Sequence, residues 1–335
     1  MSLVGSVRAV ASSDGILSIV ADGYADLATQ TPMRDDSLFW IASLSKPITA
    51  TVVMMAVDDG ALDLDAPVTD YLPDFRPPVV SIRDDGAVSS HEPATPITLR
   101  TLLNHTSGLP FASPVETPTY DLIPLATRVR AYALSPLVSP PGAAYLYSNA
   151  GYNVAARVLE VVTGSPFETV LTERLLEPLG MNDTTFWPAP AQIARLATAY
   201  RYSPDGPPEP QLISQLRYPL DDRVGRFPLA GGGLFSTAAD VASFCRSFLG
   251  GRPLLSAAAI EQMTRPVDGY RLGWAVDAEG AFGHGGAYGT VMRIHPTLGR
   301  ATVWMIQQAP SATPDPGGHA FEEFDRLVVT GTYPR

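Results

Sequence analysis

The sequence contains a single lysine, Lys46, beside 22 arginines, and Ser43 stands three residues before it. Arginine keeps its proton near neutral pH, whereas a lysine withdrawn from water can become a neutral amine and act as a base. A serine beside such a lysine can become a nucleophile, because the amine can accept its proton. Serine is a common residue, so the Ser-x-x-Lys spacing alone also fits a compositional accident.

The residues around this pair predict a helix that begins near Ser43 and ends at Gly60. Pro47 fits the first turn, where its missing N–H would have had no partner. Ser43 and Lys46 share one face of such a helix. The partial positive charge at a helix N-terminus disfavours an ammonium and favours an alkoxide. Burial of Lys46 beside the apolar Trp40 would lower the lysine pKa further.

Two more segments carry polar residues that could join such a site. Tyr147 precedes a helix predicted over 149–162, and a phenol whose pKa is lowered by a nearby cation can exchange protons near neutral pH. Asn149 can cap the N-terminus of that helix. In the run Gly283-His284-Gly285-Gly286, glycines beside a strand allow a substrate close to the backbone, and exposed N–H groups can bind an oxyanion. Taken alone, this run also fits a glycine-rich turn with a solvated histidine.

The composition limits the size of the fold, the possible partners and the possibility of a disulfide. At 335 residues and 45% hydrophobic, the chain can form one large or two ordinary domains, and it has no uninterrupted apolar run long enough for a spanning helix. The net charge of −11 argues against nucleic acid or an anionic membrane as partner. A single cysteine, Cys245, excludes an internal disulfide and is typical of a small buried helix residue.

Several standard chemistries have no motif in the chain. His-Glu-x-x-His, Cys-x-x-Cys, the phosphate-binding Gly-x-x-x-x-Gly-Lys and the Gly-x-Ser-x-Gly elbow of the α/β-hydrolases are all absent, so we expect neither a metal nor a cofactor. No signal peptide is expected in the sequence as given, which favours the cytoplasm. A leader removed ahead of Met1 would instead make the protein periplasmic or secreted, so the compartment stays open.

Strand-like patterns at both ends and helical periodicity between them predict an α+β fold. We expect five antiparallel strands, flanked by helices, from residues 1–75 and 235–335, with a mainly helical region at 76–234 and the site at the junction. The strand candidates are 6–11, 16–21, 270–276, 288–295 and 301–308. Further helices are expected at 167–176, 237–249 and 319–329.

Six segments, in this order, resemble the serine hydrolases related to class C β-lactamases, penicillin-binding proteins and family VIII carboxylesterases. The resemblance covers nearly the whole chain. The segments are Ser43-Leu44-Ser45-Lys46, Leu102-Leu103-Asn104-His105-Thr106-Ser107-Gly108-Leu109, Tyr147-Ser148-Asn149, Glu177-Pro178-Leu179-Gly180-Met181, Gly232-Gly233-Leu234-Phe235-Ser236-Thr237-Ala238-Ala239-Asp240 and His284-Gly285-Gly286.

The resemblance implies a role for each site residue. Ser43 would be the acylated nucleophile, Lys46 its proton acceptor and Tyr147 the relay to the leaving group. Asn149 and the run His284-Gly285-Gly286 would contact the substrate. The backbone N–H groups of Ser43 and Ala287 would form the oxyanion hole. His105, in the second segment, is interpreted as a structural residue.

The chain departs from the β-lactamase pattern at three places. His284-Gly285-Gly286 replaces the Lys-Thr-Gly that helps to bind the carboxylate of a β-lactam, and Ala112 stands where such enzymes tend to carry an amide side chain. The family's usual opening helix before the first strand has no counterpart: either the sequence as given omits it, or this member covers that face differently.

The two site departures favour esters over penicillins. The sequence therefore predicts an acyl-enzyme serine hydrolase of the carboxylesterase type, with weak turnover of β-lactams or D-amino-acid amides. The partner would be a small ester, amide or β-lactam, and the oligomeric state stays open. One alternative is a β-lactamase or penicillin-binding D,D-peptidase. Another is a non-catalytic ligand-binding member of the fold.

Overall fold

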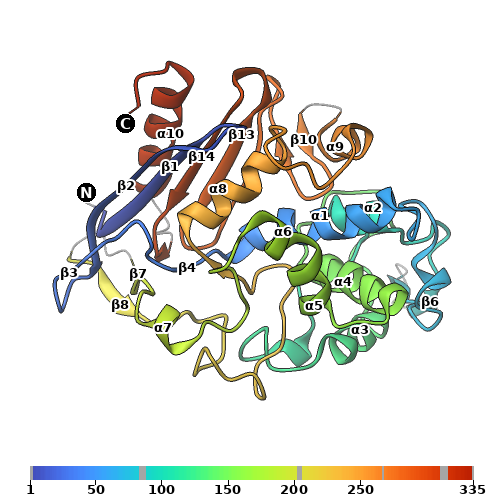
Figure 1. Ribbon diagram of the computed structural model, residues 1–335. Helices are drawn as coiled ribbons and strands as arrows, with labels where there is room; N and C mark the ends of the chain where they lie inside the picture. Colours follow the sequence, from blue (N-terminus) through green and yellow to red (C-terminus); the bar gives the residue numbers. More distant parts are fainter. Residues whose placement is uncertain (1–2, 83–87, 202–205, 266–267, 310–315, 334–335) are drawn as a thin grey trace.

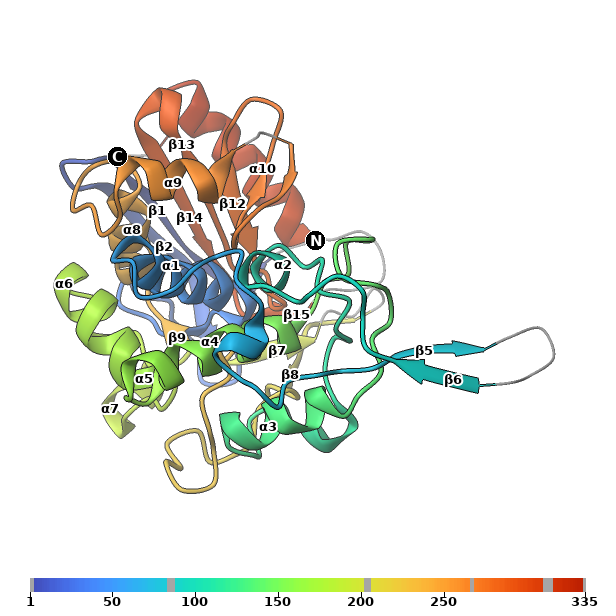
Figure 2. The same cartoon turned by 90° about the vertical axis from the view of Figure 1, so that its right-hand side faces the viewer.

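The computed structural model describes residues 3–82, 88–201, 206–265, 268–309 and 316–333. Its largest element is an eight-stranded sheet built from both ends of the chain, beside a mainly helical region (Figures 1 and 2). All neighbouring strands are antiparallel, in the order β10-β11-β12-β13-β14-β1-β2-β3. The bounds are β1 (Gly5–Ala11), β2 (Ile16–Asp26), β3 (Thr31–Pro32), β10 (Gly269–Tyr270), β11 (Ala275–Val276), β12 (Phe282–Gly285), β13 (Val291–His295) and β14 (Arg300–Met305).

The antiparallel α+β fold is confirmed, but the expected number of five strands was too low. The segment 270–276 is not one strand: it turns back at Gly273, whose φ is +92°, and forms β10 and β11. The glycine-rich run around His284 is itself strand β12, which its composition hid because glycine has a low β-propensity. The third extra strand, β3, is two residues long and pairs with the end of β2.

Two helices cover opposite faces of the sheet. Along β1, Val7 and Ala9 belong to the main core with α8 (Ala238–Ser247), whereas Val10 packs in a separate cluster with α10 (Pro316–Val329). Successive side chains of a strand point to opposite faces, so α8 and α10 lie on different sides of the sheet. The predicted helices at 237–249 and 319–329 are thereby confirmed, and Cys245 is buried in α8.

Helix α1 (Ser45–Asp58) lies at the centre of the molecule, and its first twelve residues are buried. It follows a short 3-10 turn, η1 (Ala42–Leu44), and packs against α4 (Asn149–Thr163) and α5 (Phe167–Leu171). The predicted helix at 167–176 changes after α5 into a π-helical turn, η4 (Thr172–Leu176). A helix that is buried nearly all round can support a site on its N-terminus with little freedom of movement.

The remaining elements are short. The helices are α2 (Leu99–Leu103), α3 (Leu125–Ala133), α6 (Glu177–Leu179) and α7 (Pro190–Ile193), with turns η2 (Val68–Asp70), η3 (Pro114–Glu116) and η5 (Pro296–Leu298). Small sheets pair β4 (Phe39–Trp40) with β9 (Phe235–Ser236), β5 (Val79–Ile82) with β6 (Val88–His91), and β7 (Ala199–Arg201) with both β15 (Gln308–Ala309) and β8 (Glu209–Gln211). Among the described residues, no helix is long and apolar enough to cross a membrane. The division of the chain into a sheet domain (1–75 and 235–335) and a helical domain (76–234) stays a prediction.

The start of α8 carries a buried carboxylate with a testable effect on stability. The carboxylate Oδ2 of Asp240 accepts hydrogen bonds from the Asp183 backbone N–H (2.8 Å) and the Thr184 hydroxyl (2.9 Å). Burial raises the pKa of Asp240 to about 6, although these hydrogen bonds oppose the shift. The folded protein therefore binds this proton more tightly than the unfolded chain, and its stability falls as the pH rises from about 4 to about 6.

We expect Asp240→Asn to be more stable than the wild type above pH 6, by on the order of 1–3 kcal/mol. The amide keeps an acceptor oxygen for both donors and has no charge to bury. The difference should shrink towards pH 4, where the wild-type carboxyl is protonated in the folded state and carries no charge to bury. Urea unfolding at pH 4.5 and 7.5 measures this, and an equal loss of stability at both pH values would contradict the assignment.

Candidate active site

Ser43 lies where the chain passes from β4 into α1. The preceding residue, Ala42, has a φ of +46°, a left-handed backbone conformation that is unfavourable for alanine. A distant segment of the chain holds this turn, because the Ile41 N–H donates to the Leu234 carbonyl at 3.0 Å. This strained turn leaves the Ser43 side chain partly exposed, whereas its neighbours Ala42 and Leu44 are buried.

The side chain of Lys46 is completely buried and reaches three oxygen atoms. Its Nζ lies 3.1 Å from Ser43 Oγ. It also lies 2.7 Å from Asn149 Oδ1 and 2.6 Å from the carbonyl oxygen of Gly231. Burial holds the pKa of Lys46 well below its ordinary value. The structure thus joins the predicted pair of Ser43 and Lys46 to a third predicted residue, Asn149.

These contacts fit a neutral amine. The Asn149 Oδ1 and the Gly231 carbonyl can only accept, so they take the two N–H groups that a neutral amine has. The lone pair is then left facing Ser43 Oγ, whose proton it can accept. With no carboxylate among the three partners, no opposite charge offsets the desolvation of an ammonium.

The Gly231 carbonyl is held in place by the residue before it. The Ala230 carbonyl accepts from the Thr49 hydroxyl at 2.7 Å, and the Ala230 N–H donates to Asn153 Oδ1 at 3.2 Å. A side chain at Gly231 would place its Cβ 2.9 Å from Asn149 Oδ1, so a glycine is needed at this close approach. Sequence patterns gave no signal for Gly231, because a backbone carbonyl carries no residue-type signature.

The phenol of Tyr147 lies beside both the nucleophile and the base. Its hydroxyl forms a hydrogen bond with Ser43, and the Nζ of Lys46 lies 4.6 Å from the centre of its ring. Burial raises the pKa of Tyr147, and the bond to Ser43 only partly offsets that rise. The expectation that a nearby cation lowers this pKa is therefore wrong, because desolvation is the larger effect. Tyr147 is a protonated phenol at rest, suited to donate a proton.

Both ring nitrogens of His284 lie within hydrogen-bond distance of protein oxygen atoms. Its Nδ1 lies 2.7 Å from the Gly285 carbonyl, and its Nε2 lies 3.0 Å from the Tyr270 hydroxyl. Burial lowers the pKa of His284 to about 3, so the imidazole is neutral. Tyr270 in turn lies 3.2 Å from the Tyr152 hydroxyl. Neither tyrosine was among the predicted site residues, since no local motif marks them.

The end of β12 packs against η1, which carries Ser43. Gly286 makes the close contact: a Cβ there would lie 2.1 Å from Thr290 Oγ1 and 2.6 Å from the Ile41 carbonyl oxygen. The Thr290 hydroxyl donates to that same Ile41 carbonyl at 3.1 Å. Ala287 follows in the turn after β12, so this contact sets how its backbone lies relative to Ser43. Gly285 is exposed, with open space beside its Cα.

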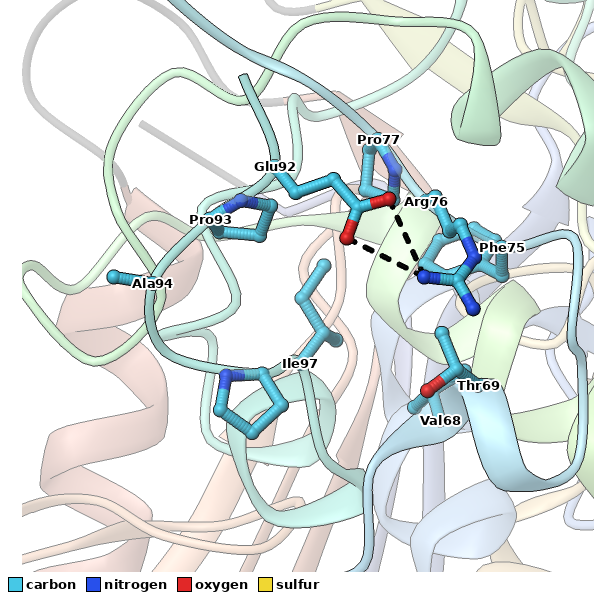
Figure 3. A pocket seen from close by; sticks show the side chains of 10 residues that line it. Val68, Thr69, Phe75, Arg76, Pro77, Glu92, Pro93, Ala94 and Ile97 are labelled. Carbon is cyan, nitrogen blue, oxygen red and sulfur yellow. Dashed lines mark hydrogen bonds and ion pairs between the residues drawn. The ribbon is translucent and has the colours of Figure 1, made fainter.

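A cavity of about 190 Å³ lies elsewhere, between segments 68–77 and 92–97 (Figure 3). Its wall is mostly apolar, and Arg76 and Glu92 pair across it at 3.3 Å. It contains none of Ser43, Lys46 and Tyr147, and it offers no nucleophile beside a base. The start of α1 is therefore the candidate site. In the part of the chain that the structure describes, no three His, Cys, Asp or Glu side chains converge as a metal would need.

Comparison with known proteins agrees with this fold. The Beta-lactamase family model matches residues 3–323. Esterase EstB of Burkholderia gladioli is 35% identical over an alignment of 269 positions that covers 71% of this chain and 64% of EstB. Penicillin-binding protein 4 of Amycolatopsis lactamdurans is 34% identical over an alignment of 280 positions that covers 82% of this chain and 68% of that protein. The solved structure of EstCE1, a hydrolase with promiscuous acyltransferase activity, matches with a TM-score of 0.79 at 26% identity, over 99% of this chain and 94% of that chain.

The antiparallel sheet, the central helix and the Ser-x-x-Lys pair at the N-terminus of that helix are those of a serine hydrolase of the β-lactamase-like class. The chain belongs to the Beta-lactamase family, whose model spans nearly all of it. The resemblance drawn from the six sequence segments is thereby confirmed.

Proposed function

We propose that this enzyme hydrolyses small carboxylic esters through an acyl-enzyme on Ser43, with weak turnover of β-lactams or D-amino-acid amides. The observation that carries the proposal is the buried Lys46, which donates to Asn149 Oδ1 and the Gly231 carbonyl and faces Ser43 Oγ at 3.1 Å. A neutral amine in that position can accept the serine proton without a histidine–aspartate pair.

The proposed acylation uses residues already in contact. Ser43 Oγ bonds to the ester carbonyl carbon as its proton passes to Lys46 Nζ, and the oxyanion is stabilised by the backbone N–H groups of Ser43 and Ala287. The carbon–oxygen bond to the alcohol then breaks. Tyr147 donates its proton to the departing alkoxide and regains one from the Lys46 ammonium. Water later attacks the acyl-enzyme, its proton returns to Ser43 Oγ, and the carboxylic acid leaves.

Two features of the site favour esters. His284 stands where the Lys-Thr-Gly lysine would be, and it is neutral with both ring nitrogens occupied by Gly285 and Tyr270. It therefore offers no cation to the carboxylate of a penicillin or a peptide. Phe111 stacks on Tyr147 with the ring centres 6.3 Å apart and stays 42% exposed, so an apolar substrate group can pack beside the phenol.

Parallel assays with p-nitrophenyl acetate and butyrate and with a chromogenic cephalosporin test this proposal. We expect both esters to be turned over faster than the cephalosporin. Ser43→Ala is the matched control, since it removes the nucleophile alone and should abolish turnover of all three. Mass spectrometry after a fluorophosphonate probe should place the adduct on Ser43. Faster turnover of the cephalosporin than of either ester would overturn the ester assignment.

The second candidate function is a D,D-peptidase or β-lactamase. It is favoured by the 34% identity to penicillin-binding protein 4 of Amycolatopsis lactamdurans, whose name describes penicillin binding. The ester and cephalosporin assays separate a β-lactamase from an esterase, and two further measurements identify a D,D-peptidase. A D,D-peptidase would release D-alanine from a D-alanyl-D-alanine peptide and would be acylated by penicillin in a long-lived form, neither of which we expect at high rates here.

A further inference from the structure

We propose that His105 is the positioning residue that holds Tyr147 in line for proton transfer. The inference rests on the proposed function, because it concerns the step that Tyr147 performs there. The sequence assigned His105 only a structural role in its turn. The structure gives this histidine several contacts with the segment that carries the phenol.

The segment 144–148 has no regular secondary structure, so its position depends on individual bonds. The His105 carbonyl accepts from the Leu146 N–H at 2.7 Å. The imidazole Nδ1 of His105 accepts from the Ser148 N–H at 3.0 Å. These two bonds hold the residues directly before and after Tyr147. The imidazole also lies against the phenol ring of Tyr147, with the ring centres 4.4 Å apart.

Several features of this position are energetically unfavourable for a histidine. It is completely buried, and its backbone has a φ of +62°, in the left-handed region. Because Nδ1 accepts a hydrogen bond, the neutral ring carries its proton on Nε2. That Nε2 has no hydrogen-bond partner among the described residues. An apolar ring would fill the same space without a buried unpaired N–H, so what the histidine adds is the Nδ1 acceptor.

The ring does not act as an acid or base itself. Burial lowers the pKa of His105 to about 2, so the imidazole stays neutral over the working pH range. Its effect is geometric. Tyr147 must keep its hydroxyl on Ser43, and small displacements of a catalytic group reduce rates steeply.

The test compares two replacements. His105→Phe keeps a flat ring but has no acceptor, whereas His105→Asn keeps an oxygen where Nδ1 stands and tolerates a positive φ. We expect His105→Phe to lower kcat by about 10–100-fold, with KM changed less than about threefold, because one general acid is misplaced. His105→Asn should be at least about threefold faster than His105→Phe. Thermal unfolding checks that both are folded, and His105→Ala replaces the phenylalanine variant if that one is not.

Two measurements distinguish a positioning role of His105 from a role in packing alone. The loss should be larger for ethyl butyrate than for p-nitrophenyl butyrate, because the poorer leaving group needs the proton of Tyr147 more. In a Tyr147→Phe background, His105→Phe should cost almost nothing further in kcat. Equal losses for both esters, the same loss in both backgrounds, or no advantage of His105→Asn would overturn the inference. If Tyr147→Phe alone keeps full activity on ethyl butyrate, the proposed role of Tyr147 fails instead.

Discussion

Lys46→Arg is expected to lower the rate of Ser43 acylation by about 10²–10⁴, the usual worth of a positioned general base, while the fold stays intact. Arginine cannot give up its proton, so it cannot accept that of Ser43. Its planar guanidinium is also larger than the compact site in which Nζ lies within 3.1 Å of three oxygens. The measurement is the burst rate of p-nitrophenol release, or the rate of labelling by a fluorophosphonate.

The matched control is the reverse exchange at an exposed position. Arg265 is 71% exposed in its side chain and only loosely paired with Glu261, at 3.9 Å. Arg265→Lys should leave the acylation rate unchanged. Should Lys46→Arg fold normally and acylate within about threefold of the wild type, well short of a general-base effect, Lys46 is not the base.

The protonation of Lys46 sets the direction in which the acylation rate changes with pH. The active form is the neutral amine, so the acylation rate should rise with pH as the Lys46 ammonium loses its proton and then level off. Because burial depresses this pKa, the rise should come well below the ordinary titration range of lysine. Acylation rates across the pH range measure it. A rate that rises only around the ordinary lysine pKa would contradict a neutral resting amine.

The second large effect is expected for Gly286→Ala, with kcat lower by about 10²–10³, the range seen when one oxyanion donor is lost. The added Cβ would lie 2.6 Å from the Ile41 carbonyl oxygen, which is backbone and cannot rotate away. The turn that carries Ala287 must then shift relative to Ser43, and the two N–H groups no longer converge. The measurement is kcat for p-nitrophenyl butyrate, with active sites counted by the fluorophosphonate.

Gly15→Ala is the control for this exchange, since an added Cβ at Gly15 meets nothing within 4 Å. It should behave as the wild type in both activity and thermal unfolding. A folded Gly286→Ala variant with kcat within about threefold of the wild type would show that this contact does not set the oxyanion donors.

Much of the site could be predicted because its main pair is local. Ser43 lies in the 3-10 turn η1 and Lys46 in the first turn of α1, only three residues apart, and this local helical geometry brings the two side chains together. The order of the six segments was enough to indicate the family and the α+β fold. The strand count failed at His284 and Gly273, since glycine-rich segments carry little strand signal and their pairing is decided by distant partners.

The sequence by itself thus determined which residue types are available for the chemistry, and that the single lysine lies beside a serine. Tertiary structure alone decided their protonation states. Lys46 is buried against Asn149 and Gly231, which are 103 and 185 residues away in the chain. The fall in the lysine pKa and the rise in that of Tyr147 both come from desolvation, which depends on everything packed around the group. A local pattern holds no information about that packing, so the proposed roles of Lys46 as base and Tyr147 as acid depend on the fold.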